Sequence, residues 1–250
     1  MKNTEREAFL AKLEYVPSII NEWSSAFGGL TEKVVLDFGC GEGLQAAGIA
    51  KNFNPKLVFG VDINNEHASI DGIFRVNSEP VEFEMPLFQQ VAPGQKLPFG
   101  ELDLIYSWSV FEHINIEIVD LVISDLRSAL AKNGHLLIQI APLYYSKEGS
   151  HLWEIGYRNW EHLTNQLDRI WSDLYSGRIS KDLADGLWSM FSSLNKLTSS
   201  DLVARVETAG FKVIRKYETQ TVDLPPAALL NVYREDVLRV DQIVLLFQKT

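Results

Sequence analysis

The sequence has only one cysteine, Cys40, which excludes an internal disulfide and a cysteine cluster for zinc. No apolar run approaches the roughly 20 residues that span a bilayer, so no transmembrane helix is expected. No run of lysine or arginine offsets the formal net charge of -10, whereas a large nucleic-acid footprint needs a concentrated basic face. These absences make nucleic acid an unlikely partner and favour a small or neutral ligand.

The composition is that of a globular protein without an export signal. Charged residues occur throughout the first thirty positions, which lack the apolar block of a secretory signal, so we expect a cytoplasmic protein. The 46% of hydrophobic and 22% of charged residues fit a chain that buries one core, and 250 residues suit a single α/β domain with an insertion. The sequence does not indicate an oligomeric state.

Short β-rich apolar runs alternate with helical patterns along most of the chain. Strands are expected at residues 33–39, 56–63, 102–110, 135–143, 211–220 and 242–249, with a further short strand between 81 and 91. Helices are expected at residues 43–53, 64–71, 117–134 and 198–210. Asn133-Gly134 and Gly210 are expected to close the last two helices. This alternation predicts an α/β fold with a mainly parallel sheet and helices on both faces.

Two segments depart from the alternation. Residues 1–29 carry apolar positions at helical spacing interrupted by Pro17, which predicts an N-terminal helical cover made of one kinked helix or two short helices. Residues 144–197 hold four of the six tryptophans and are longer than an ordinary strand-to-helix connection. We interpret them as a mostly helical insertion after the fifth strand that forms a lid over the ligand edge of the sheet.

The stretch VVLDFGCGEG places Gly39, Gly41 and Gly43 in the turn after the first strand. In an open α/β sheet this turn borders the crevice where ligands bind, and bare main chain there lets a ligand lie against the backbone. The following helix presents its N-terminal amides to an electron-rich group. The alternating glycines therefore indicate a binding loop, although a structural tight turn would have the same composition.

The residues around this turn indicate the kind of ligand. A dinucleotide fingerprint would read G-x-G-x-x-G, whereas here Leu44 stands at the last glycine position. The carboxylate of Asp37 would repel a pyrophosphate but can accept hydrogen bonds from an ammonium group or a water, and Glu42 adds a second negative charge. Asp62 ends the second strand, where an acidic side chain can bind both hydroxyls of a ribose. These features together fit a nucleoside with a cationic tail.

Four stretches, VVLDFGCGEG, VFGVDI, LPFGELDLIYSWSVFEHI and LRSALAKNGHLLIQIAP, resemble the successive motifs of class I S-adenosylmethionine-dependent methyltransferases over residues 34–142. LTSSDLVARVETAGFKVI resembles the late helix and sixth strand of the same family. The resemblance implies S-adenosyl-L-methionine as the methyl donor and a Rossmann-like seven-stranded sheet with an antiparallel last strand.

The resemblance also implies which residues contact the donor. It assigns the donor's ribose to Asp62 and its methionine half to Asp37 and the glycine turn, with the residues after the fourth strand beside it. Relatives often carry a carboxylate before a sequence like LPF to hold the adenine amino group, whereas VAPGQKLPF has none, so backbone near Val91 and Ala92 is expected to hold adenine. The candidate cofactor-binding residues are Asp37, Gly39, Cys40, Gly41, Asp62, Ile63, Val91, Ala92, Ser107, Trp108 and Ser109.

An alcohol that accepts a methyl group must lose a proton, and histidine is the usual base near neutral pH. The first candidate catalytic residues are His151 and His162, in GSHLW and NWEHL, and the next is His113, in FEHI at the mouth of the sheet. The pair GSHLW and NWEHL resembles a pattern of bacterial methyltransferases from polysaccharide and natural-product sugar pathways. The alternative is that both histidines only cap the helical insertion.

Aromatic residues that leave the fifth strand at the ligand edge are candidates for binding the acceptor. They are Tyr144, Tyr145 and Trp153, while the other aromatics of the insertion are expected to form its core. No metal is expected, because the spacing of the histidines and acidic residues fits no zinc motif.

We therefore expect an S-adenosylmethionine-dependent methyltransferase for a small-molecule or saccharide-like acceptor, with O-methylation as the favoured reaction. A nicotinamide-dependent oxidoreductase is a second hypothesis, which the missing third glycine and Asp37 disfavour. A non-catalytic, methyltransferase-like binding subunit is the third, because a donor pocket does not by itself show an acceptor site.

Overall fold

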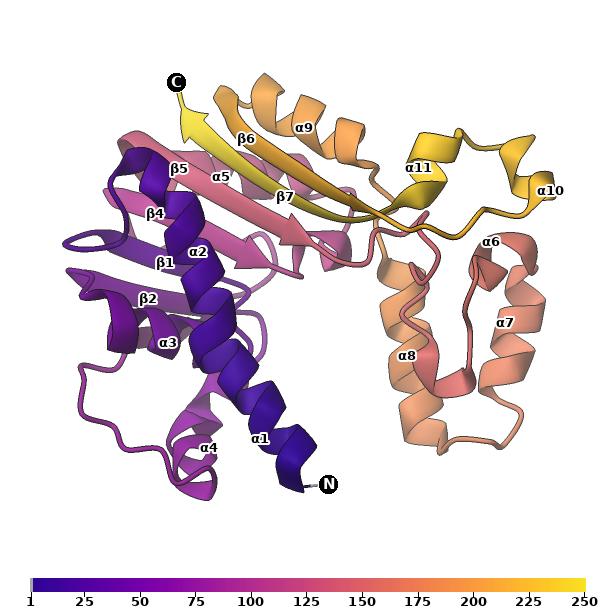
Figure 1. The fold of residues 1–250 in the computed structure, drawn as a ribbon, viewed down its shortest axis with the longest axis horizontal. Coiled ribbons are helices and arrows are strands. Elements are labelled where there is room, and N and C mark those ends of the chain that lie inside the picture. Colours follow the sequence, from indigo (N-terminus) through magenta and orange to yellow (C-terminus); the bar gives the residue numbers. More distant parts are fainter. Residues whose placement is uncertain (1) are drawn as a thin grey trace.

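The computed structural model describes residues 2–250 and is built on a seven-stranded sheet in the order β3-β2-β1-β4-β5-β7-β6 (Figure 1). The strands are β1 (Val34–Phe38), β2 (Leu57–Asp62), β3 (Leu87–Gln90), β4 (Leu102–Trp108), β5 (Leu130–Ile140), β6 (Phe211–Gln220) and β7 (Val240–Lys249). Strands β1 to β5 pair in parallel, and β7 is antiparallel to both of its neighbours. The predicted Rossmann-like sheet with an antiparallel last strand is confirmed.

Helices cover both faces of the sheet. They are α1 (Lys2–Leu10), α2 (Val16–Ser24), α3 (Leu44–Phe53), α4 (Ile70–Val76), α5 (Val119–Ala129), α6 (Glu161–Thr164), α7 (Leu167–Leu174), α8 (Lys181–Ser193), α9 (Ser199–Thr208), α10 (Ala227–Leu230) and α11 (Glu235–Arg239). The core on one face joins α2 and α3 to the sheet through buried residues such as Ile20 and Ala46. The core on the other face joins α5 and α9 through Ile123 and Leu202. The sheet therefore presents only its ends to ligands.

The N-terminal cover is broken next to Pro17, as expected. The π-helical turn η1 (Ala11–Tyr15) separates α1 from α2. Pro17 lies in the first turn of α2, where a backbone N–H would have no partner within that helix, so its absence removes no hydrogen bond of α2. Proline cannot donate to the carbonyl of Leu13, which instead receives a hydrogen bond from Asn52 Nδ2 of α3 at 3.4 Å. A Cβ atom at Gly48 would lie 2.1 Å from that carbonyl oxygen, so the glycine permits this close helix contact. Met1 of the predicted cover lies outside the described residues.

Two local predictions were wrong. The helix expected at residues 117–134 ends at Ala129, and β5 begins at Leu130 rather than at His135. Asn133 has a positive φ of 61°, and the β4–β5 register shifts beside it, so Asn133-Gly134 marks an irregularity inside β5 and not a helix end. The short helices α10 and α11, in the connection between β6 and β7, were not expected, because four or five residues give too little periodicity to detect.

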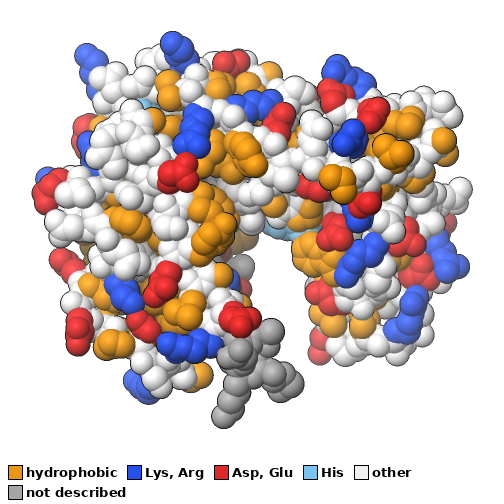
Figure 2. Space-filling view, in the orientation of Figure 1, with side chains coloured by type: hydrophobic (Ala, Val, Ile, Leu, Met, Phe, Trp, Pro, Cys, Tyr) orange, Lys and Arg blue, Asp and Glu red, His pale blue; other side chains and the backbone are white. Residues whose placement is uncertain are grey.

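Residues 144–197, here called the helical lobe, project from the sheet beyond the end of β5 and contain α6, α7 and α8 (Figure 1). Their buried residues, among them Leu152, Ile170 and Phe191, form a cluster separate from both sheet cores. Figure 2 shows a deep notch between this lobe and the part of the molecule that carries α1 and α4, with histidine side chains at the top of the notch. The lobe is thus placed beside the carboxyl ends of the parallel strands.

Candidate functional site

The glycine turn runs from Gly39 to Gly43, between β1 and α3, with all three of its glycines at positive φ. The amides of Gly39 and Cys40 both donate to the carbonyl of Val61 in β2, at 2.8 and 3.0 Å. A Cβ atom at Gly39 would lie 2.4 Å from Val110 Cγ2, so only glycine allows the segment after β4 to pack on the turn. The turn is therefore held rigidly against both neighbouring strands.

Asp62 fixes the turn from the end of β2. Its Oδ2 accepts a hydrogen bond from the Gly41 amide at 2.8 Å, and its Oδ1 accepts one from the Asn64 amide, also at 2.8 Å. A carboxylate has about four lone-pair positions, so each oxygen can still accept a bond from a ligand hydroxyl. Asp62 also lines a cavity beside the turn, so a ligand in that cavity can reach the remaining lone pairs.

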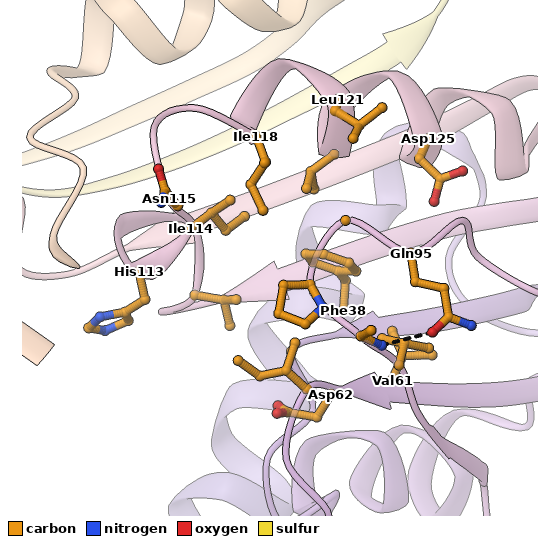
Figure 3. A pocket seen from close by; sticks show the side chains of 18 residues that line it. Phe38, Val61, Asp62, Gln95, His113, Ile114, Asn115, Ile118, Leu121 and Asp125 are labelled. Carbon is orange, nitrogen blue, oxygen red and sulfur yellow. Dashed lines mark hydrogen bonds between the residues drawn. The ribbon is translucent and has the colours of Figure 1, made fainter. Parts of the chain in front are cut away.

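A larger cavity of about 540 Å³ lies on one side of the turn (Figure 3). Figure 3 shows His113 at one end of it and Asp125 with Gln95 at the other, while Asp62 lies along its lower edge in this view. The candidate residues Gly39, Ile63, Val91 and Ala92 also line it. Most of the remaining lining is apolar, which suits a flat, largely uncharged ring system such as a purine.

A smaller cavity of about 480 Å³ lies on the other side of the turn and shares Gly39 with the larger one. It is lined by Lys12, Gly39, Cys40, Gly41, Glu42, Leu44, Gln45, Glu66, Trp108 and Ser109. Charged and polar side chains are frequent here, unlike in the larger cavity. Burial and the nearby carboxylates raise the pKa of the Cys40 thiol, so it stays protonated and is not a nucleophile.

Asp37 and Ser107 are buried beneath the turn and line neither cavity. Burial raises the pKa of Asp37 to about 7, an effect that the Tyr106 hydroxyl opposes and the Asp62 charge reinforces. Ser107 Oγ donates to the Phe38 carbonyl at 3.0 Å and so fixes β4 to β1. A positive charge above the turn would favour the ionised form of Asp37, so this aspartate suits a cationic ligand without touching it.

His113 and His151 lie together, with ring centroids 5.3 Å apart. The His113 side chain is 36% exposed and borders the larger cavity, and partial burial lowers its pKa. His151 is buried, and its Nε2 lies 3.3 Å from the Pro142 carbonyl oxygen. Burial and the neighbouring His113 lower the pKa of His151 to about 4, which makes it the weaker base of the two.

His162 lies inside the helical lobe and away from the cavities. Its Nε2 is 2.6 Å from the Tyr144 carbonyl oxygen, and burial lowers its pKa to about 4. Tyr144 is itself part of the lobe's core, where its ring packs edge-on against His162 and stacks with Phe191. In this arrangement both residues hold the lobe together.

Two other aromatic candidates remain accessible. Trp153 is 39% exposed, and its ring centroid lies 5.4 Å from that of His151. Its Nε1 donates to Glu148 Oε2 at 3.1 Å, which fixes the orientation of the indole. Tyr145 is half-buried and packs against Tyr233, at the edge of another, smaller cavity. Only Trp153 therefore adjoins the histidine pair.

Two residues that contact His113 or the backbone on either side of it were not among the predicted site residues. Glu112 is 4% exposed, neither of its carboxyl oxygens has a hydrogen-bond partner, and Oε1 lies 4.0 Å from His113 Nε2. Burial raises the pKa of Glu112 to about 8. Asn195 lies where the chain returns from the lobe to the sheet. Its side-chain Nδ2 donates to the carbonyls of Phe111 and Ile114. Its backbone N–H donates to the carbonyl of Glu112. Glu112 is recognisable beside a candidate histidine, but nothing in the sequence indicates the role of Asn195.

A family model described as a methyltransferase domain matches residues 13–216 of this chain. A search of curated proteins finds no match to it. Magnesium protoporphyrin IX methyltransferase from Synechocystis PCC 6803, solved with S-adenosylhomocysteine bound, superposes with a TM-score of 0.58 at 20% identity, over 94% of this chain and 82% of that one. An S-adenosylmethionine-dependent methyltransferase from Mesorhizobium loti superposes with a TM-score of 0.56 at 16% identity, over 88% and 92%.

A solved structure with different chemistry shares the same fold. The [4+2]-cyclase SpnF superposes with a TM-score of 0.56 at 14% identity, over 93% of this chain and 80% of that one. At such identities structural similarity shows the fold and not the reaction. Within residues 2–250 no helix is long and apolar enough to cross a membrane, and no group of three or more potential metal ligands comes together.

Proposed function

The chain belongs to the methyltransferase-domain family, whose enzymes use S-adenosylmethionine, and from this premise we propose that it methylates an oxygen atom of a small, saccharide-like acceptor. The observation that carries the proposal is the pair of cavities that share Gly39 in their lining, with His113 at one end of the larger one. A donor with an adenosine half and a methionine half requires two chambers of different polarity, and these two differ in that way.

The residues present fit this donor. Asp62 would accept hydrogen bonds from the ribose hydroxyls, with the adenine in the larger cavity beside Ile63 and the backbone of Val91 and Ala92. The methionine half would lie in the smaller cavity against Gly41 and the end of β4. A Cβ atom at Gly41 would have no atom nearer than Glu66 Oε2 at 3.9 Å. The protein's own side chains therefore leave the space beside Gly41 open to a ligand.

When bound, S-adenosylmethionine supplies a methyl group on a positively charged sulfur, which keeps the electron pair of the broken C–S bond. The protein's main contribution is to align the acceptor oxygen with that methyl group. The acceptor hydroxyl must give up its proton as the new C–O bond forms, and a ring nitrogen of His113 accepts it. The lowered pKa of His113 keeps the imidazole neutral, and therefore able to accept a proton, at neutral pH.

The acceptor would enter through the notch, with the helical lobe as its lid. Trp153 is exposed beside His151, and an exposed indole is a suitable platform for the apolar face of a sugar ring. The net charge of -10 and the two acidic side chains of the smaller cavity favour a neutral acceptor over an anionic one. His162 and Tyr144 contribute by holding the lid in shape, and His151 by packing against His113.

The function is tested by incubating the protein with methyl-labelled donor and a fractionated extract of small molecules, followed by mass analysis of the labelled product. We expect label on a hydroxyl oxygen of a neutral or sugar-containing compound. The Asp62→Ala variant serves as the control for background transfer. Label in nucleic acid, in protein or on nitrogen would contradict the proposed acceptor, although not the methyltransferase activity.

His113→Ala is expected to lower kcat about 100-fold with little change in donor binding, because loss of a general base costs about two to four powers of ten. In the unaltered enzyme, kcat/KM should fall as pH drops through the pKa of His113, and this fall should lie below the ordinary histidine value of 6.5. The measurement is the pH profile of methyl transfer to the identified acceptor. His162→Ala is the control that perturbs the lobe alone, and an equal loss of kcat with an unchanged pH profile in both variants would refute the role of His113.

A further inference from the structure

The smaller cavity contains one cation among the described residues that line it. This is Lys12 of the π-helical turn η1, and the same cavity holds the carboxylates of Glu42 and Glu66. We propose that Lys12 binds the α-carboxylate of the donor's methionine half and so makes the N-terminal cover part of the donor site. This inference rests on the donor placement proposed above.

The charges of the cavity and the ligand are complementary. The methionine half of the donor carries one negative charge, on its carboxylate, and two positive charges, on its ammonium group and its sulfur. The cavity offers one positive side chain and two negative ones. A carboxylate bound here without Lys12 would face Glu42 and Glu66 unopposed, which electrostatic repulsion disfavours.

The Lys12 side chain forms an ion pair with a residue of the glycine turn. Its Nζ donates to Glu42 Oε2 at 2.7 Å, so the ammonium group lies directly beside the glycine turn. The two side chains are 51% and 39% exposed, and an ion pair this exposed contributes little to stability. Exchanging Glu42 for a ligand carboxylate therefore costs little, and Glu42 becomes available to the ligand's ammonium group.

The backbone that carries Lys12 is rigid even though the side chain is exposed. The next residue, Leu13, is fully buried, and its carbonyl lies against α3 at Gly48 and Asn52. Helix α3 begins directly after the glycine turn, so η1 and the turn are positioned by the same helix. The family model begins at residue 13, so Lys12 lies just before the matched segment, and no motif of the sequence indicates it.

The test is a cycle of two ligands and two proteins measured by calorimetry. The ligands are S-adenosylhomocysteine and its decarboxylated analogue, which keeps the amine and lacks only the carboxylate. The proteins are the unaltered chain and Lys12→Met, which keeps the aliphatic stem. We expect Lys12→Met to weaken S-adenosylhomocysteine about tenfold and the decarboxylated analogue by less than about twofold, because only the carboxylate makes a charge-assisted bond. Lys12→Arg should restore most of the loss.

Other results would overturn the proposal. Unchanged binding of S-adenosylhomocysteine by Lys12→Met would show that Lys12 does not bind the carboxylate, and an equal loss for both ligands would show a merely structural effect. If Asp62→Ala still binds both ligands as tightly as the unaltered chain, the donor placement itself fails and the role of Lys12 with it. If Asp62→Ala loses the binding of both ligands but Lys12→Met does not weaken S-adenosylhomocysteine selectively, the donor placement stands and only the Lys12 contact is overturned.

Discussion

Replacing Asp62 by alanine is expected to weaken the binding of S-adenosylhomocysteine about 100-fold, which corresponds to about 3 kcal/mol. Two hydrogen bonds from ribose hydroxyls to a carboxylate would be lost, and each is worth about 1.5 to 3 kcal/mol. The amides of Gly41 and Asn64 would also lose their acceptor, so the turn would hold its shape less well. Isothermal calorimetry at fixed pH and salt measures the effect.

The direct contact can be separated from the effect on the turn. The 2′-deoxy analogue of S-adenosylhomocysteine should bind the unaltered chain about tenfold more weakly than the parent ligand, because one charged hydrogen bond is absent. The Asp62→Ala variant should bind the two ligands equally. Asp71→Ala, at an exposed position in α4, is the matched control and should change neither affinity. A persistent preference of Asp62→Ala for the parent ligand would refute the ribose contact.

Replacing Glu112 by glutamine is expected to remove much of the loss of stability that the protein undergoes as pH rises from about 4.5 to about 8. Glu112 is buried without a hydrogen-bond partner, and burial raises its pKa from 4.5 to about 8. Below pH 4.5 the carboxyl is protonated in the folded and the unfolded chain alike. As pH rises toward about 8, the unfolded chain ionises while the folded chain holds its proton, so unfolding releases a proton.

The free energy of unfolding therefore falls through this pH range and stops falling once the folded carboxyl ionises as well. One pKa unit corresponds to about 1.4 kcal/mol, so the contribution of Glu112 is on the order of 4 kcal/mol. Glutamine has nearly the same shape and never ionises, so Glu112→Gln should lose about that much less stability between about pH 5 and pH 9. Asp37, whose pKa is also raised, should leave a smaller decline in the variant.

Urea unfolding at several pH values measures this difference. Glu117→Gln is the matched control, because Glu117 is exposed on the same loop and its change should leave the pH dependence unaltered. Parallel stability curves for Glu112→Gln and the unaltered chain would show that Glu112 is ionised in the folded protein at neutral pH, contrary to its burial.

The sheet and the glycine turn were predictable because each depends on signals within a few neighbouring residues. An apolar run that ends at an aspartate and is followed by alternating glycines specifies a strand, a turn and a helix without reference to the rest of the chain. The end of α5 was mispredicted because a pair such as Asn133-Gly134 occurs both at the end of a helix and at an irregularity within a strand. Pairing of β5 with β4 decides between them, and pairing is not a local property.

The assignment of histidines could not be made from sequence. The sequence offers His113, His151 and His162 as candidates, but their surroundings differ in the fold: His113 is partly exposed, His151 packs beside it, and His162 lies inside the lobe. Similarly, Tyr144 and Trp153 both follow β5, yet Tyr144 enters the lobe's core and Trp153 stays exposed beside His151. The fold of the lobe decides which side chain faces the ligand, and its short helices leave only weak periodicity in the sequence.

By itself the sequence determined the strand-turn-helix with its three glycines, the acidic residue across from it and hence the family, because backbone conformation at glycine and the end of a strand are encoded locally. Only the tertiary structure brought Lys12 to the smaller cavity and Asn195 to the segment that carries His113. Their contacts join segments far apart in the chain, and the environment that sets a side chain's charge and accessibility exists only after those segments have packed together.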